Sequence, residues 1–155
     1  MRIGHGYDVH RLSEGLPLTI GGVRIDHSKG FVAHSDGDVL IHAIIDALFG
    51  AAGLPDIGAH FPDSDNRYRG ISSVLLLEEC IRIVRAKGLE IESIDSTVLA
   101  QAPKLKPHIY AMRETLAKAL SISVDCINVK ATTEEKLGFT GSEDGIAAHA
   151  VCLLK

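Results

Sequence analysis

The sequence has no tryptophan, few aromatic residues, three cysteines and a formal charge of only -4. Cys80, Cys126 and Cys152 are odd in number and far apart, which argues against a disulfide framework and against a cysteine-based zinc site. No basic stripe indicates a nucleic-acid partner. There is neither an apolar run of membrane-spanning length nor a signal-peptide pattern, so we expect no membrane association, a cytoplasmic location and reduced cysteines.

The hydrophobic periodicity predicts strands and helices in the order β-β-α-α-β-α-β-β. The predicted strands cover residues 1–9, 18–25, 91–102, 126–133 and 146–155, and the predicted helices cover 36–53, 71–87 and 107–120. Two polar segments, 55–70 and 134–145, are predicted loops. A chain of 155 residues suits one core. We therefore predict a single domain, residues 1–155, of the α+β class, with a mixed or antiparallel sheet and helices on one face.

Histidine is unusually frequent, with eight residues. Asp8 and His10 are two apart in a predicted strand, so their side chains share a face. His42, in the first predicted helix, is the best candidate for a third ligand, with Asp38 or Asp46 orienting its imidazole. A catalytic zinc site has three protein ligands and one open position, which this set would provide. Each residue taken alone is more often an ordinary polar side chain than a metal ligand.

The neighbours of this pair in the strand have expected places too. Val9, between the two ligands, should point the other way, towards the core. Gly6 should let another backbone or a substrate approach closely.

Two further segments suit phosphate groups. His34 and Ser35 come directly before a predicted helix, whose N-terminus offers free amides, although Ser35 or Asp36 could simply be its N-cap. Thr132 to Glu135 place two hydroxyls beside two carboxylates, a set that suits Mg²⁺ or Mn²⁺ on a phosphate or, equally, an ordinary polar turn. The stiff basic loop 100–107 could hold a base or a diphosphate, or only connect two elements. Serine and cysteine nucleophile motifs, the P-loop and the dinucleotide fingerprint are all missing.

Five segments in this order resemble the 2-C-methyl-D-erythritol 2,4-cyclodiphosphate synthase family of the non-mevalonate isoprenoid pathway. They are "RIGHGYDVH", "IGGV", "AHSDGDVLIHAIIDALFGAAGLPDIGAHFPDSD", "AQAPKLKPHI" and "NVKATTEEKLGFTG". The resemblance implies that a CDP-linked methylerythritol 2-phosphate is closed into a cyclic diphosphate with release of CMP. It also implies a homotrimer with active sites between subunits.

The resemblance further implies a role for each matching residue. Zinc falls on Asp8, His10 and His42, the second divalent ion (Mg²⁺ or Mn²⁺) on Glu135, and transition-state stabilisation on His34 and Thr133. The implied substrate contacts are Ser35, Asp56, Ile57, Gly58, Phe61, Pro62, Asp63, Ser64, Asp65, Ala100, Gln101, Ala102, Pro103, Lys104, Leu105, Lys106, Thr132, Glu134, Phe139 and Ser142. Asp56 and Gly58 would meet the ribose, Phe61–Asp65 the methylerythritol part, and Ala100–Lys106 the cytosine.

Three positions depart from the family pattern or leave it ambiguous. Ser142 stands where several members carry an arginine facing a prenyl-diphosphate cavity, and His149 where members often carry glutamate. Glu134 beside Glu135 leaves two carboxylates for one metal, of which the motif favours Glu135. Two other functions stay open: a zinc-dependent phosphohydrolase, and a regulatory trimer that binds a prenyl diphosphate. Ser142 argues against the second.

Overall fold

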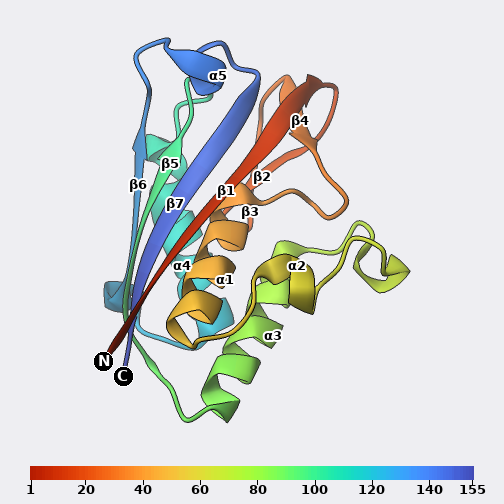
Figure 1. Ribbon diagram of the computed structural model, residues 1–155. Helices are drawn as coiled ribbons and strands as arrows, with labels where there is room; N and C mark the ends of the chain where they lie inside the picture. Colours follow the sequence, from red (N-terminus) through yellow and green to blue (C-terminus); the bar gives the residue numbers. More distant parts are fainter.

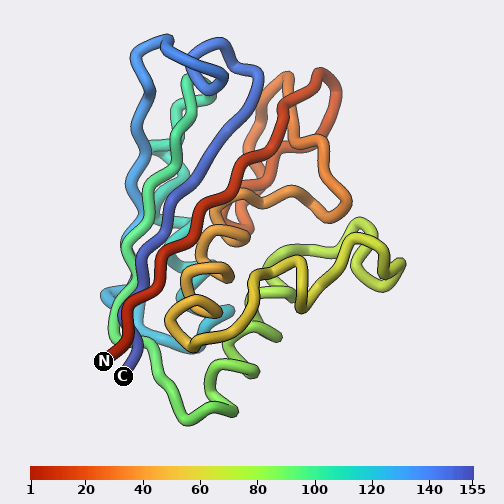
Figure 2. Tube along the Cα trace, viewed as in Figure 1, coloured from red at the N-terminus to blue at the C-terminus, as the bar shows by residue number.

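A five-stranded mixed sheet runs through the computed structural model, which describes residues 1–155 (Figure 1). In spatial order its strands are β4 (Lys29–Val32), β1 (Arg2–Glu14), β7 (Gly145–Leu154), β5 (Ile91–Leu99) and β6 (Ile127–Thr132). Only the β5–β6 pair is parallel. Arg2 pairs with Leu154, so the two chain ends lie together at one end of the sheet (Figure 2).

The three longer helices lie on one side of this sheet (Figure 1). They are α1 (Val39–Ala51), α3 (Ser73–Ala86) and α4 (Ile109–Leu120). Helix α1 packs directly on β1 and β7 and is buried almost all round, as its nearly continuous apolar sequence requires. The predicted α+β class and the helices on one face are confirmed, with a mixed sheet.

Helix α1 begins at Val39 with Asp38 as its N-cap. The Asp38 carboxylate accepts a hydrogen bond from the backbone N–H of Ile41 and further bonds from those of Gly21 and Gly22. The alternative that Ser35 or Asp36 simply caps the helix was wrong, because both lie too early in the chain. One fully buried carboxylate thus joins the start of α1 to a neighbouring turn.

Short elements account for most other differences from the prediction. Residues 18–25 form a hairpin, β2 (Leu18–Ile20) and β3 (Val23–Ile25), which turns at Gly21 and Gly22 with positive φ angles. The loops contain further short helices: α2 (Ile57–His60), η1 (Asn66–Tyr68), η2 (Lys106–His108), η3 (Val124–Cys126) and α5 (Gly138–Gly141). Strand β4 was missed, and β1 continues well beyond residue 9 because it pairs with both β4 and β7.

The sheet face opposite the helices is open. Val9 points to it and is 41% exposed, so the prediction that Val9 faces the core was wrong. The reason is that Gly4, Gly6 and Leu12 are the buried residues of β1, which places Asp8 and His10 on the helix-covered side.

None of the helices has the length and apolar character needed to span a membrane.

Candidate active site

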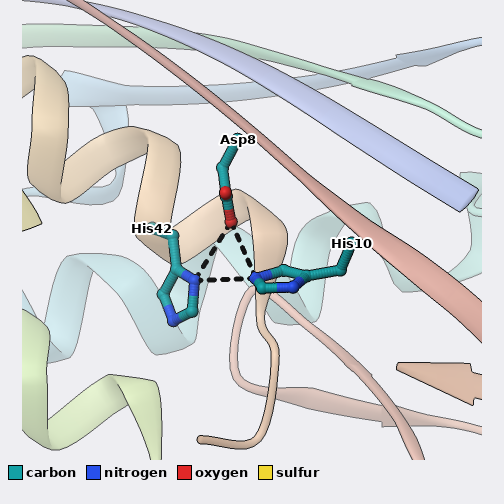
Figure 3. Close-up of side chains that lie close together, drawn as sticks. All are labelled: Asp8, His10 and His42. Carbon is teal, nitrogen blue, oxygen red and sulfur yellow. Dashed lines mark hydrogen bonds and ion pairs between the residues drawn. The ribbon is translucent and has the colours of Figure 1, made fainter. Parts of the chain in front are cut away.

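Asp8, His10 and His42 meet in a triangle of donor atoms (Figure 3). Asp8 Oδ2 lies 3.0 Å from His10 Nε2 and 3.0 Å from His42 Nδ1, and the two imidazole nitrogens are 3.1 Å apart. The two β1 residues face the helix that carries His42. The predicted three-residue cluster is therefore present in the structure.

Glycine in β1 lets the strand approach the helix this closely. A Cβ atom added at Gly6 would stand 1.9 Å from the carbonyl oxygen of Ala43, and one added at Gly4 would stand 1.9 Å from that of Ala47. No larger residue fits there without moving backbone. The expectation that Gly6 allows close backbone approach is confirmed.

The electrostatics of the triangle favour a charged cluster. Burial raises the pKa of Asp8, but hydrogen bonds and charge from His10 and His42 outweigh it and lower that pKa to about 2. Burial lowers the pKa of His42, but the hydrogen bond to Asp8 and the nearby carboxylates raise it above its ordinary value of 6.5. Asp8 is thus a carboxylate at neutral pH, ready to bind a cation.

The triangle fits a divalent cation. Zinc ligands stand about 2 Å from a tetrahedrally coordinated ion, which separates them from one another by roughly 3.3 Å. The measured 3.0–3.1 Å sides are close to that spacing. An Asp-His-His set that leaves one side open is the donor chemistry of a catalytic rather than a structural metal site.

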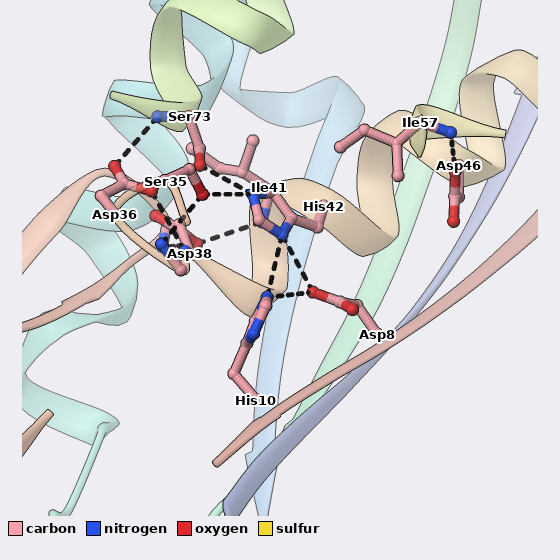
Figure 4. A network of polar contacts seen from close by, with 12 residues as sticks. Asp8, His10, Ser35, Asp36, Asp38, Ile41, His42, Asp46, Ile57 and Ser73 are labelled. Atoms are coloured by element: carbon pink, nitrogen blue, oxygen red, sulfur yellow. Dashed lines mark hydrogen bonds and ion pairs between the residues drawn. The ribbon is translucent and has the colours of Figure 1, made fainter. Parts of the chain in front are cut away.

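The far nitrogen of His42 has partners that the sequence did not predict (Figure 4). His42 Nε2 lies 2.9 Å from the Oγ of Ser73 and 3.4 Å from that of Ser35. Asp38 and Asp46 do not orient this imidazole: Asp38 caps α1, and Asp46 accepts a bond from Ile57 N at 2.8 Å. Both were predicted because they are four residues from His42, but their carboxylates bond to backbone instead.

A cavity of about 240 Å³ opens beside the triangle. It gathers nine of the predicted residues: Asp8, His10, His34, Ser35, His42, Ile57, Gly58, Phe61 and Asp63. The Nε2 atom of His34 is buried and has no hydrogen-bond partner in the chain. An unpaired buried nitrogen beside an open metal position is suited to meet a ligand.

A second cavity, of about 370 Å³, lies where the chain leaves β5 and β6. It is lined by the predicted residues Ala100, Gln101, Pro103, Lys104, Leu105, Lys106, Thr132 and Thr133, together with Ile109 and Ala131. Gln101 Oε1 accepts a bond from Lys136 N at 3.1 Å, which ties its two loops together. This cavity shares no residue with the metal cavity.

Comparison with known proteins agrees with this geometry. The model of the YgbB family matches residues 1–155. The 2-C-methyl-D-erythritol 2,4-cyclodiphosphate synthases of Pseudomonas putida and Azotobacter vinelandii are each 60% identical over 154 residues, covering 99% of this chain and 98% of theirs. The chain belongs to the YgbB family. The identification made from the sequence segments is thereby confirmed.

Solved structures of similar proteins have the same fold. A structure of 2C-methyl-D-erythritol-2,4-cyclodiphosphate synthase in its CDP-bound form superposes with a TM-score of 0.92 at 41% identity, covering 99% of this chain and all of that one. The bifunctional IspDF of Campylobacter jejuni gives a TM-score of 0.96 at 46% identity, but this chain, 99% covered, spans only 42% of that longer protein. A CDP complex from Plasmodium falciparum, at 35% identity and a TM-score of 0.86, covers 99% of this chain and 94% of that one.

The other residues predicted from the YgbB family resemblance lie outside the two cavities. Asp56 lines a separate cavity together with Asp46. Pro62, Ser64 and Asp65 belong to the segment between α2 and η1, where Asp65 pairs with Arg67. Ala102 lies in the loop of the second cavity, while Glu134, Glu135, Phe139 and Ser142 follow β6. The roles of all these residues stay predictions.

Sequence reasoning missed Ser73, the buried partner of His42. Its only signal was its place at the start of a predicted helix, which reads as a helix cap. Tyr68 and Leu76 of the metal cavity also went unpredicted. Tyr68 stands between two arginines in a polar loop, and the apolar helix sequence around Leu76 resembles ordinary core.

Proposed function

We propose that this YgbB-family chain converts 4-diphosphocytidyl-2-C-methyl-D-erythritol 2-phosphate into 2-C-methyl-D-erythritol 2,4-cyclodiphosphate and CMP, as a lyase of isoprenoid precursor biosynthesis. The observation that carries the proposal is the Asp8–His10–His42 triangle, open to a cavity that also holds the unpaired His34. An oxygen of the 2-phosphate attacks the β-phosphorus, and the bond from that phosphorus to the oxygen bridging it to the α-phosphorus breaks. CMP leaves with that oxygen, and an eight-membered ring remains.

This reaction needs no nucleophile from the protein. The chain has to bring the two ends of a flexible, highly charged substrate together and to balance the negative charge that gathers there. His34 and Ser35 can donate hydrogen bonds to phosphate oxygens from the metal cavity. Thr133 and Lys104 can do so from the second cavity.

The triangle is proposed to hold Zn²⁺ and the segment after β6 to hold Mg²⁺ or Mn²⁺. Bound cations would supply the positive charge that polarises the phosphates. Both exposed carboxylates accept a hydroxyl hydrogen bond: Glu134 Oε2 from the buried Thr140, and Glu135 Oε1 from the exposed Thr133 at 3.2 Å. Glu135 is the better ligand, because its partner is exposed and can turn away, whereas Glu134 is held against a buried hydroxyl.

We also propose that a working site combines two copies of the chain in a homotrimer. The metal cavity and the second cavity share no residue, although one substrate would have to contact both. The open sheet face offers a surface for another copy, since it exposes the apolar side chains of Ile3, Val9 and Val151. A cytoplasmic location is part of the proposal, and three free cysteines suit it.

The experiment is ³¹P NMR of the purified protein with the CDP-linked substrate, Zn²⁺ and Mg²⁺. The proposal expects CMP and a cyclic diphosphate in equal amounts, and no turnover or bound zinc for His42→Ala. Linear phosphates would instead indicate a phosphohydrolase. His27→Ala is a control outside the two cavities and should keep both turnover and zinc.

A further inference from the structure

A chain of hydrogen bonds runs from the metal triangle into the protein (Figure 4). His42 Nε2 lies 2.9 Å from Ser73 Oγ, and Ser73 Oγ donates to Asp36 Oδ1 at 2.5 Å. Ser73 is fully buried at the start of α3, and Asp36 lies in the loop before α1. The start of α3, distant in sequence, therefore meets α1 and the loop before it behind one metal-ligand candidate.

The direction of each hydrogen bond follows from the proton count. A serine hydroxyl has one proton, and a carboxylate can only accept. Since the Ser73 proton lies on the short bond to Asp36, Ser73 Oγ must accept from His42, which requires a proton on His42 Nε2. The Asp36 carboxylate is fixed in this position by two backbone N–H groups, from Ser73 at 2.9 Å and Asp38 at 3.1 Å.

A proton held on Nε2 leaves Nδ1 as the nitrogen whose lone pair can bind a cation. His42 Nδ1 is the atom that faces Asp8 and His10 at 3.0 and 3.1 Å. We propose that Ser73 and Asp36 are positioning residues, which keep His42 in the Nε2–H form and so set the affinity of the triangle for a divalent cation. The inference rests on the proposed function only in that both use the same cation-binding triangle.

Ser35 does not replace this arrangement. Its Oγ is 3.4 Å from His42 Nε2 and also accepts a bond from Gly37 N at 3.2 Å. A bond of that length is marginal next to the 2.9 Å bond to Ser73.

Asp36 also has a structural role, which the test must separate. Its Oδ2 accepts from Ser73 N at the first turn of α3, where Ser72, the N-cap, makes no side-chain bond. Ser73→Ala keeps that backbone bond and removes only the hydroxyl. Ser72→Ala is a matched control, because it removes the hydroxyl of the adjacent, exposed serine that does not contact His42.

The first measurement is the affinity of the full chain for Zn²⁺ alone, by competition with a chromophoric chelator. Loss of a group that orients a metal-binding histidine costs about 10- to 100-fold in affinity, so Ser73→Ala should bind that much more weakly and Ser72→Ala as wild type. Equal affinities for Ser73→Ala and wild type would overturn the proposal. Because no substrate is present, failure of the proposed reaction would not alter this result.

The second measurement is the tautomer of His42, by ¹H–¹⁵N NMR of zinc-loaded, histidine-labelled protein. Wild type should show a slowly exchanging Nε2–H on His42 and no proton on Nδ1, whereas Ser73→Ala should exchange that proton faster. Asp36→Ala removes the acceptor of the Ser73 proton, so that Ser73 can donate to Nε2 and oppose cation binding; its zinc affinity should fall at least as far. A proton on Nδ1 of zinc-loaded wild type, or unchanged affinity in a folded Asp36→Ala, would contradict the assignment.

Discussion

Gly6 of β1 lies directly against the backbone of Ala43 in α1. A Cβ at position 6 would stand 1.9 Å from the Ala43 carbonyl oxygen. This close approach brings Asp8 within 3.0 Å of His42, although 33 residues separate them in the chain. The metal triangle therefore depends on a glycine that carries no ligand.

Gly6→Ala should push β1 from α1 and weaken both the fold and the cation site. Overpacking against backbone costs about 3 kcal/mol of unfolding free energy, and zinc content should fall with it. Gly50→Ala is the control: position 50 has only the His5 carbonyl oxygen near, at 3.9 Å, and alanine is favoured in a helix by up to about 1 kcal/mol. Thermal unfolding with zinc analysis distinguishes the two, and a Gly6→Ala protein with wild-type zinc content would refute the close-approach argument.

Asp38 should make stability fall as the pH rises. Burial raises its pKa from 3.8 to about 6, against hydrogen bonds from Gly22, Ile41 and Gly21 that lower it. Between pH 4 and pH 6 the folded chain therefore keeps a proton on Asp38 that the unfolded chain has lost. The stability that this proton contributes is fully present below about pH 4 and is lost as the pH rises through 6. The difference between the pKa values of 3.8 and about 6 corresponds to about 3 kcal/mol.

Asp38→Asn removes this titration while keeping a side-chain acceptor at the cap. Between pH 4 and 7 the variant should gain about 3 kcal/mol in unfolding free energy relative to wild type, measured by urea unfolding at one protein concentration. A difference between the two proteins that stays constant over this range would mean that Asp38 is ionised throughout.

Glu135→Gln should weaken the second cation site and leave the first intact. The magnesium concentration for half-maximal turnover should rise about tenfold, the effect of losing about 1.4 kcal/mol of binding, while zinc content stays the same. Glu134→Gln is the matched control, because Glu134 is held by the hydroxyl of the buried Thr140. If Glu134→Gln alone shifts the magnesium dependence, the two carboxylates have been assigned the wrong way round.

The metal triangle could be predicted because each part depends on local geometry. Strand periodicity places Asp8 and His10 on one face, and the apolar surroundings of His42 place its helix against the sheet. The sequence could not predict which face of β1 packs on the helices. The apolar Val9 indicates one face, but the structure packs the other face on α1, through Gly4 and Gly6.

Other parts of the site depend on contacts that no local pattern records. Ser73 reaches His42 only because α3 packs beside α1. Asp38 and Asp46 lie at helical spacing from His42, but their carboxylates bond to the backbone of neighbouring loops. Strands of three or four residues, such as those of the hairpin and β4, are too short to show alternation.

The most direct test of the central claim mixes two inactive variants. His42→Ala lacks the metal triangle and Thr133→Val lacks a hydroxyl of the second cavity. If each site takes its triangle from one copy and its second cavity from the next, a random one-to-one mixture of chains in homotrimers would contain about a quarter of intact sites. ³¹P NMR of co-refolded protein should then show cyclic diphosphate forming at about a quarter of the wild-type rate. A mixture as inactive as either variant alone, with wild type active, would contradict the account.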